Sequence, residues 1–126
     1  MKKVVITNDA PAPIGPYNQA IIAGNFIFVS GQIPAHPFTG EVITDDITVA
    51  TNLVMENIGA ILHQAGADYS NIVKTTIFLT DMASFAAVNE VYGSYFTDKF
   101  PARETVAVAG LPKGVHVEIS VIAVKS

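Results

Sequence analysis

Two side chains in the last quarter of the chain have the chemistry that a small acidic ligand requires. Arg103 is the only arginine in the sequence and lies in the segment 100–108. Its planar guanidinium is always charged and binds a carboxylate or a phosphate bidentately, which a lysine does poorly. Glu118 follows in the segment 115–121, where apolar and polar residues alternate as in a β-strand. We therefore expect an anion receptor with a carboxylate adjacent to it.

The register of the strands decides whether these two side chains meet. One register pairs Ala109 with Gly114 in a hairpin. In that register Glu118 faces Thr105, two residues from Arg103. A slip of one residue places the two side chains on opposite faces of the sheet. On strand pattern alone, a solvated strand face or a surface ion pair therefore remains an alternative to a binding site.

Four further residues could line a cleft. Tyr17 begins a strand-like segment at the edge of a loop, where its hydroxyl can donate a hydrogen bond. Ser30 and Gly31 end a strand, and a glycine there lets a ligand approach the backbone closely. Asn89 lies among apolar neighbours in a predicted helix. Each has a structural alternative: a rim tyrosine, a strand-ending turn or a hydrogen-bonded interface amide.

Several classes of site have no support in the sequence. The chain has no cysteine, so it has no thiolate nucleophile and no cysteine metal site. The three histidines show no metal-ligand spacing. No phosphate-binding glycine loop or nucleophilic serine elbow is present. The sequence therefore favours a small carboxylate-bearing substrate with water as the reactant, and neither metal nor cofactor.

Composition indicates one domain, 1–126, with part of its surface buried against a partner. Charged residues make up 14% of the chain and hydrophobic residues 50%, whereas about 25% charged is typical. No apolar run reaches the roughly 18 residues of a membrane helix, so a subunit interface is the expected place for this apolar surface. The net charge of −4 weighs against nucleic acid. The apolar run near the first residue is too short for the core of a signal peptide, and we expect a cytosolic protein.

The predicted elements alternate in a pattern typical of an α+β domain. We expect helices over 46–65, capped by Asp45 or Asp46 and stopped by Gly66, and over 84–97, with Ser84 as its cap. Gly24-Asn25 predicts a hairpin. The expected strands are 3–7, 17–23, 26–30, 72–80, 105–109 and 115–124. The order β-β-β-α-β-α-β-β predicts two helices on one face of a mixed sheet, with an apolar face left for a partner.

Several motifs occur together in an order that resembles one known family. They are Gly15-Pro16-Tyr17-Asn18-Gln19-Ala20, Phe28-Val29-Ser30-Gly31-Gln32-Ile33-Pro34, Gly40-Glu41, Pro101-Ala102-Arg103, Leu111-Pro112-Lys113-Gly114 and Val117-Glu118-Ile119. They resemble the RidA (YjgF) family of reactive intermediate deaminases over essentially the whole chain. The resemblance implies a chorismate-mutase-like α+β fold and a homotrimer with ligand clefts between subunits. It also implies cofactor-free hydrolysis of 2-aminoacrylate and related enamines or imines to 2-oxo acids and ammonia.

The resemblance also implies roles for individual residues. Arg103 would bind the substrate carboxylate, and Glu118 would position or deprotonate the attacking water or relay a proton to the leaving ammonia. The cleft would be lined by Tyr17, Ser30, Gly31, Asn89 and Thr105. Three positions depart from the family pattern: Thr105 stands where many members have cysteine, Glu104 where a small residue is usual, and Ser120 where an acidic residue is common.

Two other functions stay open at this point. The first is a trimeric metabolite-binding or regulatory module that holds a 2-oxo acid at the same cleft without useful turnover. Binding and catalysis would both use Arg103, whereas only catalysis should need Glu118. The second is RNA cleavage or translation inhibition, which is associated with some RidA-like proteins. The acidic balance of this chain weighs against it.

Overall fold

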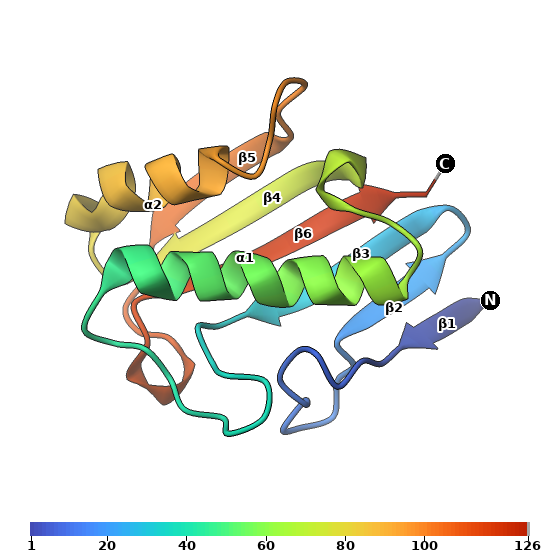
Figure 1. The fold of residues 1–126 in the computed structure, drawn as a ribbon, viewed down its shortest axis with the longest axis horizontal. Helices are drawn as coiled ribbons and strands as arrows, with labels where there is room; N and C mark the ends of the chain where they lie inside the picture. Colours follow the sequence, from blue (N-terminus) through green and yellow to red (C-terminus); the bar gives the residue numbers. More distant parts are fainter. Residues whose placement is uncertain (126) are drawn as a thin grey trace.

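The computed structural model describes residues 1–125 as six strands and two α-helices in the order β-β-β-α-β-α-β-β (Figure 1). The helices are α1 (Ile47–Gln64) and α2 (Phe85–Gly93). The strands are β1 (Lys2–Val5), β2 (Ala20–Ala23), β3 (Phe26–Gln32), β4 (Ile72–Leu79), β5 (Ala102–Ala107) and β6 (Val117–Val124). The predicted order of elements is therefore confirmed.

All six strands form one sheet in the order β1-β2-β3-β6-β4-β5. Strands β4 and β5 are parallel, and every other neighbouring pair is antiparallel. Because parallel strands need a crossover connection, the chain passes through α2 between β4 and β5. Both helices cover the same face of the sheet (Figure 1), which confirms the predicted α+β arrangement.

Local sequence signals fix the ends of several elements as predicted. The turn between β2 and β3 contains Gly24 at φ +60°, a conformation that glycine adopts at little cost. Asp46 caps α1, because its carboxylate accepts hydrogen bonds from the backbone N–H groups of Thr48 (3.0 Å) and Val49 (3.1 Å). Gly66, at φ +83°, follows the end of α1.

Three predicted boundaries near the candidate site are wrong. The strand predicted over 17–23 begins at Ala20, so Tyr17 lies in the loop before it. Helix α2 ends at Gly93 instead of residue 97, and Ser84 makes no capping hydrogen bond through its side chain. The turn that follows is closed by tighter bonds, such as Phe96 N–H to the Gly93 carbonyl (3.1 Å), and glycine is a poor helix former. Strand β5 spans residues 102–107 instead of 105–109. Arg103 therefore lies inside a strand and not before one.

The hydrophobic core lies between the two helices and the covered face of the sheet. Alternate residues of β6 enter it, namely Val117, Ile119, Val121 and Ala123. The opposite face is uncovered in the single chain, with Phe26 48%, Phe28 44% and Val106 40% exposed. The sequence predicted this apolar, uncovered face. Within residues 1–125, no helix is long and apolar enough to span a membrane.

Candidate active site

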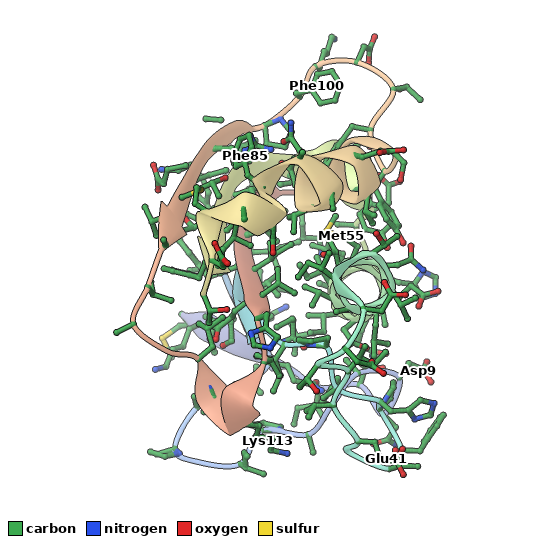
Figure 2. All side chains as sticks on the ribbon, turned by 90° about the vertical axis from the view of Figure 1, so that its left-hand side faces the viewer. Asp9, Glu41, Met55, Phe85, Phe100 and Lys113 are labelled. Atoms are coloured by element: carbon green, nitrogen blue, oxygen red, sulfur yellow. The ribbon has the colours of Figure 1, made fainter. Side chains whose placement is uncertain are left out.

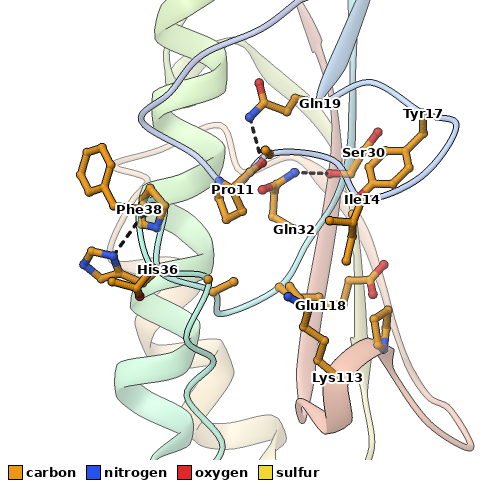
Figure 3. A pocket seen from close by; sticks show the side chains of 18 residues that line it. Pro11, Ile14, Tyr17, Gln19, Ser30, Gln32, His36, Phe38, Lys113 and Glu118 are labelled. Atoms are coloured by element: carbon orange, nitrogen blue, oxygen red, sulfur yellow. Dashed lines mark hydrogen bonds between the residues drawn. The ribbon is translucent and has the colours of Figure 1, made fainter.

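Glu118 lies in a cavity on the uncovered face of the sheet. It sits on β6 opposite Phe78 of β4. The cavity measures about 770 Å³ and is also lined by Tyr17, Ser30 and Gly31 (Figure 3); we call it the Glu118 cavity. Burial raises the pKa of the Glu118 carboxyl above the ordinary glutamate value, because an apolar environment disfavours the charged form. Three residues that the sequence analysis selected separately therefore share one cavity with Glu118.

Gly31 lets the Glu118 carboxylate lie against the backbone of β3. A Cβ atom at position 31 would stand 2.1 Å from Glu118 Oε2 and 2.9 Å from its carboxyl carbon. Residue 31 also falls where the pairing of β3 with β6 shifts register, between Val29 and Gln32, and such bulges re-aim side chains. Any side chain at position 31 would therefore displace the carboxylate.

A buried amide at Gln19 fixes the N-terminal loop that walls the Glu118 cavity. The Gln19 side chain is 2% exposed and accepts the Thr7 N–H at 2.8 Å. Its Nε2 donates to the carbonyls of Ala10 (3.2 Å) and Pro11 (2.9 Å). Nearby, Ser30 Oγ donates to the Asn18 carbonyl at 2.6 Å. Because buried amides are costly unless paired, these bonds hold the loop in one position.

A second buried amide, at Asn57 of α1, holds the loop that follows β3. Asn57 is 1% exposed, and its Nδ2 donates to the Ala35 carbonyl at 3.0 Å. Ala35 lines the Glu118 cavity. Sequence reasoning missed both Gln19 and Asn57. The available signal for Asn57 was a polar residue on the apolar face of α1, directly before Ile58.

Arg103 lies in a different cleft, at the edge of the sheet beside α2. It pairs with Thr75 of β4, which is fully buried beneath the helices. Its Nη1 donates to Asn89 Oδ1 at 2.5 Å. The cleft measures about 520 Å³ and is lined by Asn89, Tyr92, Gly93, Phe100, Pro101 and Arg103; we call it the Arg103 cleft. Arg103 and Asn89, which the sequence analysis named separately, therefore lie together.

Thr105 follows Arg103 on the same face of β5. Its Oγ1 is buried and has no hydrogen-bond partner within residues 1–125. A buried hydroxyl without a partner is uncommon in native proteins. The departure from cysteine at this position therefore places an unpaired hydroxyl next to Arg103.

The suggested hairpin register between the last two strands is wrong. Strands β5 and β6 do not pair, because β4 lies between them. Arg103 pairs with buried Thr75 and so faces the helices, whereas Glu118 pairs with Phe78 on the uncovered face. Phe100 of the Arg103 cleft and Lys113 of the Glu118 cavity also lie at opposite ends of the molecule (Figure 2). Arg103 and Glu118 are therefore not adjacent within one chain.

The uncovered face carries the other two departures from the family pattern. Glu104 forms an ion pair with Lys74 at 3.2 Å and accepts a hydrogen bond from Thr76 Oγ1 at 3.3 Å. Ser120 lies on the opposite side of Thr76, on β6. Both departures are thus outside the lining of the Glu118 cavity and of the Arg103 cleft. Within residues 1–125, no three histidine, aspartate or glutamate side chains gather as metal ligands.

Comparison with known proteins finds relatives that match almost the whole chain. A family model described as Endoribonuclease L-PSP matches residues 7–125. A RutC family protein of Pyrococcus horikoshii is 53% identical over 99% of this chain and 99% of its own length. The chloroplastic Reactive Intermediate Deaminase A of Arabidopsis thaliana is 48% identical over 97% of this chain and 65% of that protein.

Solved structures agree with these sequence relatives. The YjgF gene product of E. coli superimposes with a TM-score of 0.94 at 46% identity, over 98% of this chain and 99% of that one. E. coli TdcF with bound serine gives a TM-score of 0.94 at 44% identity, with the same coverage. The fold and the chain length coincide with both solved structures. The chain belongs to the RidA (YjgF) family, the family whose model is described as Endoribonuclease L-PSP.

Proposed function

We propose that this protein hydrolyses reactive enamines and imines, such as 2-aminoacrylate, to a 2-oxo acid and ammonia. The observation that carries the proposal is Glu118, a carboxylate whose pKa is raised by burial in a cavity beside Ser30 and the Gly31 backbone. Its similarity to Reactive Intermediate Deaminase A of Arabidopsis supports the reaction class. TdcF, solved with bound serine, supports a small ligand with a carboxylate.

The chemistry asks little of the protein beyond positioning. After 2-aminoacrylate takes up a proton on carbon, the resulting 2-iminopropanoate has an electrophilic C=N carbon. Glu118 accepts a proton from water as the oxygen adds to that carbon, and the protonated Glu118 then gives a proton to the nitrogen, which returns it to the carboxylate form. The carbinolamine then loses ammonia as the C=O bond forms. An acceleration of 10³-fold requires about 4 kcal/mol, within reach of one general base and a bound carboxylate.

The separation of Arg103 from Glu118 leads us to propose that each active site is shared between subunits of a homotrimer. Arg103 of one chain would bind the substrate carboxylate, and Glu118 of the next chain would act on water. The exposed apolar side chains of Phe26, Phe28 and Val106 support burial of the uncovered face against neighbouring copies. The resemblance to the RidA family implies the same assembly. No cofactor takes part in this proposal.

A complementation experiment tests this arrangement. Arg103→Ala and Glu118→Gln chains, carrying different tags, are co-expressed, and mixed oligomers are purified through both tags. Each variant alone should be inactive toward 2-aminoacrylate generated from serine by a dehydratase. In every trimer that carries both tags, one of the three clefts combines an intact Arg103 with an intact Glu118, which is about one third of the clefts. Recovery of roughly that fraction of wild-type activity supports a shared site.

The control for complementation is a mixture of the two variants purified separately and combined without subunit exchange, which should stay inactive. Mixed oligomers with no activity would contradict the shared site. Wild-type protein that fails to accelerate the decay of 2-aminoacrylate would contradict the deaminase itself. The metabolite-binding module would then become the favoured function, and titration with 2-oxo acids would measure it.

The description of the matching family model keeps RNA as a second candidate. The net charge of −4 and the scarcity of arginine weigh against an RNA-binding surface. Binding to single-stranded RNA that weakens steeply between 50 and 200 mM salt would support this candidate, as expected when several phosphates are contacted. Location in the cytosol stays a prediction from sequence.

A further inference from the structure

Two aromatic rings of α2 enclose the guanidinium of Arg103. Its central carbon, Cζ, lies 5.6 Å from the centroid of the Phe85 ring and 5.2 Å from that of the Tyr92 ring. Both distances fall within the range of cation–π attraction, up to about 6 Å. The two rings are two turns apart on the same helix. The helix therefore supplies an apolar surround for the only arginine in the chain.

The Tyr92 ring is a fixed wall. Tyr92 is 3% exposed, and its hydroxyl donates to Thr75 Oγ1 at 2.9 Å. The ring also packs against Phe96, with centroids 4.9 Å apart. Thr75 in turn pairs with Arg103 across the two parallel strands. The strand that carries the guanidinium and the ring that contacts it are thus tied together.

A hydrogen bond to Asn89 restricts the orientation of the guanidinium further. Its Oδ1 accepts a hydrogen bond from Arg103 Nη1 at 2.5 Å, from the helix turn between Phe85 and Tyr92. A guanidinium has five N–H donors, so four stay available to an anion after this bond. The Arg103 cleft, where Phe100 and Pro101 form the other wall, is the space beside them.

We propose that Phe85, Tyr92 and Asn89 are positioning residues that hold the Arg103 guanidinium ready for a planar carboxylate. This inference rests on the proposed function, in which Arg103 binds the substrate carboxylate. A long arginine side chain normally loses rotamer freedom when it binds a ligand. Here the aromatic rings and the amide restrict it beforehand, so ligand binding costs less. The three residues act through Arg103 and need no contact with the reacting atoms.

The single arginine makes this arrangement directly observable by NMR. A ¹⁵N–¹H spectrum of the full-length protein should contain one Arg Nε–H signal, that of Arg103. Ring currents from Phe85 and Tyr92 should shift that signal away from the position of a free arginine. Phe85→Leu keeps an apolar side chain and removes one ring, and it should move the signal toward the free position. Phe85→Tyr keeps an aromatic ring, and its Arg103 signal should stay at the wild-type position.

The same variants give a binding and a kinetic readout. Phe85→Leu should weaken the binding of 2-oxobutanoate, measured by calorimetric titration, about fivefold. It should raise KM for the imine by a similar factor and leave kcat within about twofold, because Arg103 does not take part in the proton transfers. Ala86→Leu, at an exposed position in the same turn of α2, is the matched control and should change neither quantity.

The outcomes separate this inference from the proposed function. An unchanged Arg103 signal and unchanged 2-oxobutanoate affinity in Phe85→Leu would overturn the positioning role. The positioning role would also be overturned if Phe85→Tyr changed the Arg103 signal and the 2-oxobutanoate affinity as much as Phe85→Leu does. Altered packing, and not loss of the ring, would then explain both changes. Wild-type protein that binds 2-oxobutanoate without turning over imines would reject the deaminase and still allow the positioning role to be measured. A wild type that neither binds nor turns over would reject both.

Discussion

The Glu118 cavity and the Arg103 cleft are built in contrasting ways. The cavity is enclosed by segments far apart in sequence, which Gln19 and Asn57 hold together through buried hydrogen bonds to loop carbonyls. The cleft is made by α2, by the loop that follows it and by Arg103 near the start of β5, which are consecutive along the chain. The Glu118 cavity therefore depends on packing between distant segments, and the Arg103 cleft depends on a local β4-α2-β5 unit.

The chemical tasks of the two groups explain this contrast. A carboxylate becomes a useful base at neutral pH only if its environment shifts its pKa, and burial does so for Glu118. A guanidinium keeps its charge in any environment, so its environment need only fix its direction. We therefore expect the Glu118 cavity to set the rate of hydrolysis and the Arg103 cleft to set the affinity for the substrate. Three experiments test this division between rate and affinity.

The largest effect is expected from Glu118→Gln, which keeps the size of the side chain and removes the base. The kcat for imine hydrolysis should fall about 10²- to 10⁴-fold, whereas 2-oxo acid binding should persist because Arg103 is intact. Stopped-flow decay of 2-aminoacrylate and calorimetric titration measure the two quantities. Glu104→Gln, a charge change on the same sheet face outside the cavity, is the control. Equal losses in both variants would contradict a specific role for Glu118.

A smaller loss is expected from Gly31→Ala. The added Cβ would overlap Glu118 Oε2 and push the carboxylate out of position, and a displacement near 1 Å can cost about 10²-fold in rate. Thermal unfolding should change little, since residue 31 has no left-handed φ. The control is Gly110→Ala, where a Cβ meets nothing within 4 Å. Full activity in Gly31→Ala would show that the position of this carboxylate does not set the rate.

The smallest effect is a shift in the titration of Glu118. Burial raises its pKa in the single chain, and a guanidinium brought near by a neighbouring subunit would lower it. Arg103→Ala should therefore move the pKa of Glu118 upward relative to the wild type. ¹³C NMR titration of the glutamate carboxyl carbons measures this. An identical pKa in both proteins would mean that Arg103 and Glu118 do not meet.

The sign of the pH effect on stability follows from the same shift. A carboxyl whose pKa is higher in the folded than in the unfolded chain favours the folded state only while it is protonated. That contribution is lost as pH rises through the folded value. Glu118→Gln should therefore be stabilised relative to wild type at neutral pH, the expected consequence of placing a base in a desolvated cavity.

Much of the fold could be predicted because its signals are local. Asp46 and Gly66 bracket α1, Gly24 marks the β2–β3 turn, and the alternation in β6 separates core from uncovered residues. The end of α2 could not be placed so well, because an aromatic stripe continues past Gly93 into a turn. The spacing of apolar residues shows which side chains are buried. It does not show where the helix ends, because a turn after the helix can bury the same side chains.

The site was predictable as a set of residues and not as an arrangement. The residue types can be read from the chain alone: one permanently charged guanidinium, one carboxylate on an apolar strand, no thiol, and a glycine next to Ser30. Only the folded sheet shows that β4 separates β5 from β6 and that Arg103 and Glu118 occupy opposite faces. Strand order is set by which apolar faces pack best across the whole sheet, and no local pattern in either strand encodes that free energy.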